Sequence, residues 1–147
     1  TIKIYKTKNI TILKCTSAYP TPHNEANLSA IDTLKMELIE FENDFNLSFG
    51  YSDHTVSTNV ISRAVHHYNC KFIEFHLDLD GKGEEFSSGH CWLPEQMKKV
   101  IDNINTDFET DGNGVFGPTK SEINDREWRA DPSDGLRPLI KNRNKFK

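Results

Sequence analysis

The stretch that decides the fold is CKFIEFHL, residues 70–77. Side chains alternate between the two faces of an extended chain, so Glu74 and His76 share one face. The opposite face is apolar and carries Ile73, Phe75 and Leu77. This alternation predicts a strand with one face buried against a core and an acid and an imidazole together on the other.

Two more short apolar runs, residues 10–16 and 47–51, predict strands of the same kind. After each strand, apolar residues recur every three or four positions, which is the spacing of an amphipathic helix. The predicted helices cover residues 27–41, 56–68 and 94–104. Strands that alternate with helices imply parallel strands joined by helical crossovers.

The predicted fold class is therefore α/β. Three strand-helix units cannot close an eightfold barrel, which needs about 250 residues, so this is either a small open sheet or the last part of a (β/α)8 barrel. Residues 107–147 are rich in Gly, Asp, Asn and Pro, with one short helix expected over 119–129. We therefore divide the chain into a barrel-like part, 1–108, and a loop-rich C-terminal extension, 109–147.

Composition excludes several functions. The chain has 147 residues and a net charge of -4, which gives no electrostatic reason to bind nucleic acid. No apolar run approaches the ~20 residues needed to cross a bilayer, so we expect no membrane segment. An odd count of three cysteines without CxxC spacing favours reduced thiols and a cytoplasmic location.

Polar residues gather where the predicted strands end, and ligands of parallel α/β sheets bind at that edge. These residues are Ser17 and Tyr19 after the first strand, Ser52, Asp53 and His54 after the second, and Glu74 and His76 on the third. Two histidines from neighbouring strand ends with carboxylates nearby predict a site for Mn²⁺, Mg²⁺ or Zn²⁺. The alternative is that His54 caps the following helix and His76 is a hydrogen-bonded barrel histidine.

The other candidate motifs are weaker. His23, His66 and His67 fit surface or packing positions. His90 stands beside Cys91 in the third loop, but such a pair alone is poor evidence for nucleophilic catalysis. The glycine-bearing run GNGVFGP, residues 112–118, lacks the Lys-Ser/Thr of a phosphate-binding loop, so we interpret it as a turn.

Four motifs resemble the sialic acid synthase (N-acetylneuraminate synthase) family in order and spacing. They are KCTSAYPTP (14–22), GYSDHT (50–55), FIEFHLDLD (72–80) and GPTKSE (117–122). The resemblance covers most of residues 10–122. It implies a (β/α)8 barrel, often followed by a small antifreeze-like domain, in which the predicted strands are the sixth, seventh and eighth.

The resemblance also implies an activity: condensation of phosphoenolpyruvate with the aldehyde of an N-acylated hexosamine, with release of phosphate. By the matching motifs, His54 and His76 bind a divalent metal, Mn²⁺ or Mg²⁺. Ser52, with Asp53 beside it, holds the phosphate of phosphoenolpyruvate. The sugar side consists of Ser17, Tyr19 and Glu74, and we expect Glu74, His76 and Tyr19 to be catalytic. The full-length parent is expected to be a homo-oligomer.

Two departures from the family pattern bear on function. The loop GKGEEFSSGHCWL, residues 81–93, replaces the usual family loop, so Glu84, Glu85 or His90 is a candidate for its acidic residue. The chain also begins at Thr1 without the family's first five strands, so we expect a partial chain that is inactive alone. The alternatives are another metal-dependent sugar aldolase or hydrolase barrel, or a non-catalytic fragment that completes a split barrel.

Overall fold

The computed structural model describes residue 4 and residues 6–146. Its centre is a parallel sheet of four strands in the order β1-β2-β3-β4. The strands are β1 (Asn9–Cys15), β2 (Asn46–Asp53), β3 (Phe72–Leu77) and β4 (Cys91–Trp92). The predicted parallel α/β fold is confirmed, but the strand count of three is wrong. The prediction that the three strands are the sixth to eighth of a barrel leaves no place for β4. This strand was missed because two residues are too few to show a periodic pattern.

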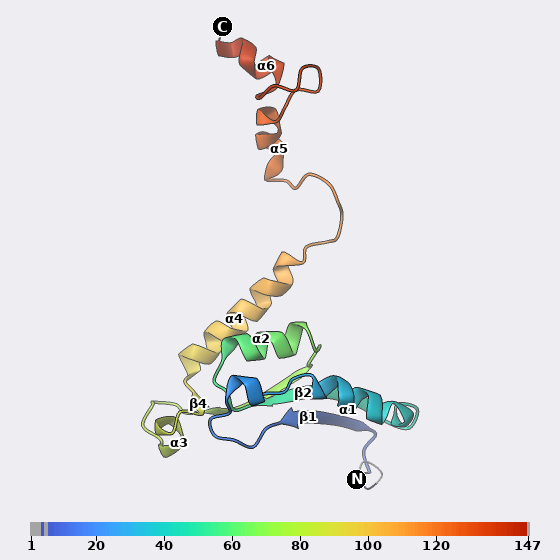
Figure 1. Ribbon diagram of the computed structural model, residues 1–147, viewed down its shortest axis with the longest axis vertical. Helices are drawn as coiled ribbons and strands as arrows, with labels where there is room; N and C mark the ends of the chain where they lie inside the picture. Colours follow the sequence, from blue (N-terminus) through green and yellow to red (C-terminus); the bar gives the residue numbers. More distant parts are fainter. Residues whose placement is uncertain (1–3, 5, 147) are drawn as a thin grey trace. The chain divides into compact units, whose positions relative to one another are not determined.

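Helices connect the strands, and a last helix, α4, follows β4 (Figure 1). They are η2 (His23–Glu25), α1 (Ala30–Leu38), η3 (Ile39–Phe41), α2 (Thr58–His66), α3 (Glu84–Ser87) and α4 (Pro94–Thr110). The first two long helices begin later than predicted, because Asn27 and Val56 adopt positive φ angles of 43° and 49° and cannot be helical there. The apolar stripe thus starts in the loop before each helix.

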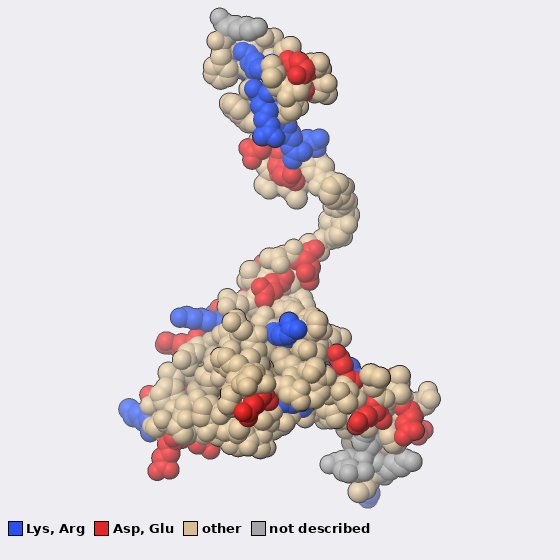
Figure 2. Space-filling view, viewed as in Figure 1, with Lys and Arg blue, Asp and Glu red and all other residues tan. Residues whose placement is uncertain are grey.

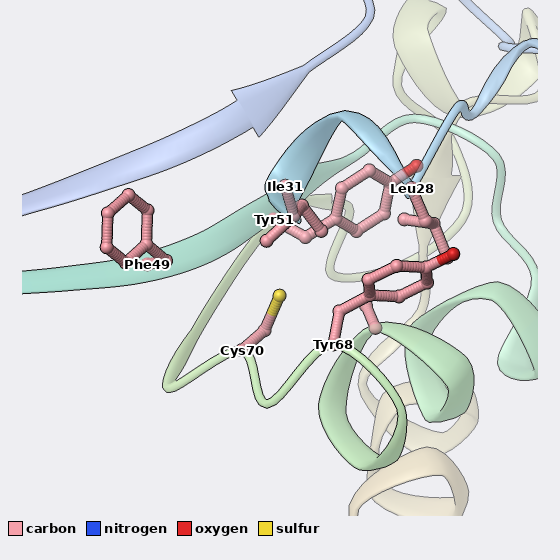
Figure 3. Packing of buried hydrophobic residues seen from close by; sticks show 7 residues of the cluster. Leu28, Ile31, Phe49, Tyr51, Tyr68 and Cys70 are labelled. Atoms are coloured by element: carbon pink, nitrogen blue, oxygen red, sulfur yellow. The ribbon is translucent and has the colours of Figure 1, made fainter. Parts of the chain in front are cut away.

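One face of the sheet packs against these helices. Phe49 and Tyr51 of β2 join Leu28 and Ile31 near α1 in one buried cluster (Figure 3). A second cluster joins residues of α2, β4 and α4, namely Ile61, Trp92, Met97 and Val100. Ile73 packs against both clusters and Phe75 against the second, as the alternation in CKFIEFHL predicts.

The strand register determines what lies on the other face. Cys15 of β1, Ser52 of β2 and Glu74 of β3 are paired neighbours, and His76 pairs with Cys91 of β4. Since alternate residues point to opposite faces, the polar residues lie opposite the apolar core. Ser52, Glu74 and His76 therefore share the sheet face that the helices leave open, whereas Asp53 pairs with Phe75 on the core side.

A lysine is buried on the helix side of β1. Lys14 pairs with Tyr51, and its Nζ donates to Thr16 Oγ1 at 2.5 Å and to the carbonyl of Ala26. Burial lowers its pKa below the ordinary 10.5, against an opposite effect of Cys15. Lys14 is thus a buried cation whose hydrogen bonds go to neutral oxygens.

The chain divides into two compact units, Thr1–Thr110 and Asp111–Lys147. The predicted boundary after residue 108 falls in the last turn of α4. The second unit contains α5 (Glu122–Asp125), η4 (Arg126–Trp128), α6 (Ile140–Arg143) and η5 (Asn144–Phe146). Its loop is organised by Asp131, which accepts hydrogen bonds from Ser133 and Ile140; these lower the pKa of Asp131 to about 2.

Basic and acidic side chains are interspersed on both units (Figure 2). In the second unit, basic residues form ion pairs: Arg129 with Glu122, Lys141 with Glu127 and Arg143 with Asp134. Among the helices described, none combines the length and apolar character needed to span a bilayer.

Candidate metal centre

Three histidines meet where β2 and β3 end and where β4 begins. The ring centroids of His54 and His76 lie 5.1 Å apart, and those of His76 and His90 are also 5.1 Å apart. The structure thus brings together the predicted pair, His54 and His76, and adds His90 from the loop before β4.

A hydrogen bond fixes the orientation of His54. The residue is buried, and its Nδ1 lies 2.8 Å from the carbonyl oxygen of Thr16 in the loop after β1. A carbonyl only accepts, so Nδ1 must carry the proton and Nε2 has a free lone pair. His54 therefore does not cap α2, which was the alternative interpretation; it is oriented as metal-binding histidines usually are.

His76 is oriented in the same way by a carboxylate. Its Nδ1 lies 3.1 Å from Glu85 Oε2, and this hydrogen bond is the main reason that the pKa of Glu85 is below its usual value. The ionised carboxylate accepts a hydrogen bond from Nδ1–H, so the lone pair of Nε2 is free to bind a cation. The predicted alternative, a hydrogen-bonded histidine, is correct for one ring nitrogen only.

Glu74 completes a three-residue ligand set. One ligand atom from each of His54, Glu74 and His76 lies within 4.8 Å of the other two. Two imidazoles and a carboxylate suit Mn²⁺, Zn²⁺ or Fe²⁺, and the exposed position of Glu74 leaves room for substrate or water on an ion held there. The residues present therefore fit a divalent metal.

Tyr19 packs against all three imidazole rings. Its ring centroid lies 4.3 Å from that of His54, 5.1 Å from His90 and 5.7 Å from His76. The side chain is 50% exposed. Its loop is tied down by the backbone hydrogen bond from Thr21 N to His54 O at 2.8 Å. Tyr19 thus forms a wall of the candidate site.

The other predicted sugar-loop residue, Ser17, lies at the edge of the site. It is exposed, and its Oγ is 3.9 Å from Cys15 Sγ. Ser52 is buried between Cys15 and Glu74 in the sheet register. Both hydroxyls therefore come from the same edge of the sheet as the histidines.

Asp53 is fully buried, and its carboxylate is bonded within the protein. Oδ1 accepts from the backbone N and the hydroxyl of Thr55, and Oδ2 accepts from Val56 N and from the indole Nε1 of Trp92. In this structure Asp53 holds the turn that carries His54. A contact with substrate, as the sequence predicts, would require it to exchange one of these bonds.

Sequence reasoning gave too little weight to three residues of the divergent loop. Glu85 lies 3.1 Å from His76, and Cys91 and His90 lie beside Glu85, at 3.8 Å and 3.9 Å. His90 and Cys91 are buried although they follow a polar, glycine-bearing loop. The signal that could have revealed them is the run HCWL before Pro94, a short buried strand.

The fold and site define a class: a parallel α/β protein with a cluster of histidines and a carboxylate at its strand ends that could hold a metal ion. More specifically, the chain belongs to the NeuB family, whose family model matches residues 1–116.

Relatives of known name agree with this assignment. The chain is 35% identical over 117 residues to an N,N'-diacetyllegionaminic acid synthase of Campylobacter jejuni, covering 80% of this chain and 33% of that protein. It is 29% identical over 98 residues to an N-acetylneuraminate-9-phosphate synthase of Drosophila melanogaster, covering 67% and 24%. The chain spans about a third of the length of the first of these curated relatives.

A solved structure is also similar. It is the N-acetylneuraminic acid (sialic acid) synthetase of Leptospira borgpetersenii in complex with citrate, with a TM-score of 0.55 and 28% identity. The similarity covers 84% of this chain and 41% of that one.

Proposed function

We propose that this chain supplies the metal-binding part of a nonulosonic (sialic) acid synthase. The reaction is the condensation of phosphoenolpyruvate with the aldehyde of an N-acylated hexosamine, which forms a carbon-carbon bond and releases phosphate. The supporting observation is that the ring centroids of His54 and His76 lie 5.1 Å apart. Their Nδ1 atoms are hydrogen-bonded to Thr16 O and Glu85 Oε2, which leaves each Nε2 free. The synthase names of the relatives support the same reaction class.

The chain covers about a third of the first relative's length. We therefore propose that the whole reaction is carried out by a larger assembly that includes this chain. In that assembly the four strands form part of a (β/α)8 barrel, and other strands supply the groups that grip phosphoenolpyruvate. The open sheet face carrying Cys15, Ser52 and Glu74 would line the barrel interior. We further propose a cytoplasmic homo-oligomer.

Within this proposal the residues have distinct roles. His54 and His76 hold Mn²⁺ or Mg²⁺, and the bound ion would polarise the aldehyde oxygen as a Lewis acid. Glu74, the third residue of this ligand set, also faces the sugar beside them. Tyr19 supplies a half-exposed ring over the histidines, and Ser17 marks the rim where a sugar hydroxyl would bind. Ser52 offers its hydroxyl to the phosphate of phosphoenolpyruvate. Positioning matters because two substrates must meet.

The metal part of the proposal is tested by Mn²⁺ titration of the full 147-residue chain, followed by electron paramagnetic resonance. His54→Ala and His76→Ala should each abolish binding. His23→Ala is the matched control, since His23 is an exposed histidine of the same unit, and it should bind as the parent does. Unchanged Mn²⁺ affinity in both site variants would end the proposal.

The reaction is tested with the proposed assembly, in which this chain is combined with the polypeptide that supplies the other strands of the barrel. Phosphate release from phosphoenolpyruvate should depend on an added N-acylhexosamine. Phosphate release without any sugar would instead favour a different metal-dependent barrel.

A further inference from the structure

A second group of metal-ligating side chains surrounds Glu85 in the loop before β4. The set is His76, Glu85, His90 and Cys91, with one ligand atom from each within 4.8 Å of all the others. Glu85 Oε2 is central to it: His76 Nδ1 lies at 3.1 Å, Cys91 Sγ at 3.8 Å and His90 Nε2 at 3.9 Å.

These separations are close to those of ligands on one ion. Two ligand atoms on a tetrahedral zinc ion lie about 3.4–3.6 Å apart for the usual Zn–N, Zn–O and Zn–S bond lengths. The contacts of Glu85 Oε2 with Cys91 and His90 are too long for strong hydrogen bonds. The distances from Glu85 Oε2 are therefore within about half an ångström of those that ligands of one ion require, and the other pairs of ligand atoms lie within 4.8 Å.

The surroundings of His90 prepare it as a ligand. The hydroxyl of Ser88 donates to the carbonyl of Glu85 at 2.9 Å, so its oxygen accepts from His90 Nδ1 at 3.0 Å. The proton of His90 therefore lies on Nδ1, and Nε2 faces Glu85 with its lone pair free. His90 is 6% exposed, so a serine hydroxyl holds a buried imidazole in the orientation that a metal needs.

We propose that His76, Glu85, His90 and Cys91 form a second cation site, selective for Zn²⁺-like metals, that competes with the set His54, Glu74 and His76. Two imidazoles, a carboxylate and a thiolate are a zinc-type donor set, whereas the first set lacks sulfur and suits harder ions. The proposal depends on the geometry of the loop and not on the reaction proposed above.

The competition follows from His76, which belongs to both sets. In the first set its Nδ1 keeps the proton donated to Glu85, and Nε2 is the free ligand. In the second set Nδ1 faces the ion, so the proton must move to Nε2. A neutral imidazole has one free nitrogen at a time, and occupation of one set therefore withdraws His76 from the other.

Cobalt is a suitable probe because a thiolate bound to Co²⁺ gives a charge-transfer band in the near ultraviolet. Titration of the full chain with Co²⁺ should produce this band at one ion per chain. The band should be absent in Cys91→Ser. In His90→Ala the apparent affinity for Co²⁺, measured from the band, should fall at least about tenfold. Because both residues are buried, Glu85→Gln at an exposed position is a third variant with little risk of unfolding, and it should weaken the band similarly.

The matched control is Cys15→Ser. Cys15 Sγ lies 4.0 Å from His54 Nδ1 and is not a member of the second set, so its loss should not alter the band. His54→Ala removes a member of the competing set, so it should not weaken Co²⁺ binding at the second set. Absence of a band in the parent chain, its loss in Cys15→Ser, or a stoichiometry of two ions would overturn the proposal. If the Co²⁺ band is absent but His54→Ala abolishes Mn²⁺ binding, the second site is wrong and the proposed function stands. If the Co²⁺ band behaves as expected but His54→Ala binds Mn²⁺ like the parent, only the proposed function is wrong.

Discussion

Asp53 Oδ2 accepts a hydrogen bond from Trp92 Nε1 at 3.0 Å, which joins the end of β2 to β4 on the far side of β3. Asp53 directly precedes His54, and Trp92 directly follows Cys91. The bond therefore links the strand end next to His54, a member of the first ligand set, to the strand that carries Cys91, a member of the second. Because it is buried, this bond fixes the distance between β2 and β4, which neither strand determines alone.

Trp92→Phe should lower the free energy of unfolding of this unit by about 1.5–3 kcal/mol, because it removes a buried donor to a carboxylate. Urea unfolding followed by circular dichroism measures the change. Trp128→Phe is the control, since that indole is largely exposed in the second unit, and it should change stability by less than about 0.5 kcal/mol. Equal stability of the two variants would contradict the structural role of the bond.

Gly50→Ala should destabilise the sheet by about 2–3 kcal/mol through overpacking. A Cβ at Gly50 would lie 2.3 Å from the carbonyl oxygen of Phe72 and 2.5 Å from Leu13 Cδ2, and the backbone contact cannot yield without moving β3. Gly117→Ala, where nothing lies within 4 Å, should leave the thermal midpoint unchanged. A Gly50→Ala protein as stable as the parent would show that the strands are spaced more widely than here.

Glu85→Gln should weaken Mn²⁺ binding by about 10–100-fold, the usual effect of losing a carboxylate that orients a metal-binding imidazole. Its hydrogen bond to His76 Nδ1 holds that ring. Isothermal titration calorimetry of the folded chain gives the affinity. Glu84→Gln changes the neighbouring acidic residue and should have no effect; if both variants bind Mn²⁺ like the parent, Glu85 does not orient His76.

Lys14→Met should flatten the rise of stability with pH. The pKa of Lys14 is lowered by burial, so between that pKa and the ordinary value of 10.5 the unfolded chain binds more protons than the folded one. Stability of the parent should therefore increase with pH across this window, relative to the variant. Urea unfolding at a series of alkaline pH values measures the difference. A constant difference would mean that Lys14 keeps its ordinary pKa.

The parts of the fold that the sequence predicts are those with a strong repeating pattern. Alternation in residues 72–77 predicted β3 and its buried face. The packing of Ile73 and Phe75 confirms it for these two residues, whereas Leu77 of the same face is 47% exposed. Helix starts were less accurate, since apolar Val56 continues the stripe but has a positive φ. β4 escaped prediction because Cys91–Trp92 is only two residues long.

The candidate site was predicted in part for the same reason. The positions of His54 and His76 follow from strand parity and from the rule that parallel strands end at one edge. Their orientation does not, because it depends on Thr16 and Glu85, which come from other loops. Loops lack periodicity, so the placement of Glu85 and His90 could not be read from the residues around them.

The amino-acid sequence by itself determined the parallel α/β architecture, the family and the pairing of His54 with His76, because these depend on repeating apolar patterns and on motifs that are local in the chain. Only the tertiary structure decided which ring nitrogens are free, that Asp53 is tied to Trp92, and that His90 and Cys91 gather around Glu85. The physical reason is that a hydrogen bond or a ligand set needs a few atoms within a few ångströms. Packing of the loops sets such distances between residues far apart in the chain.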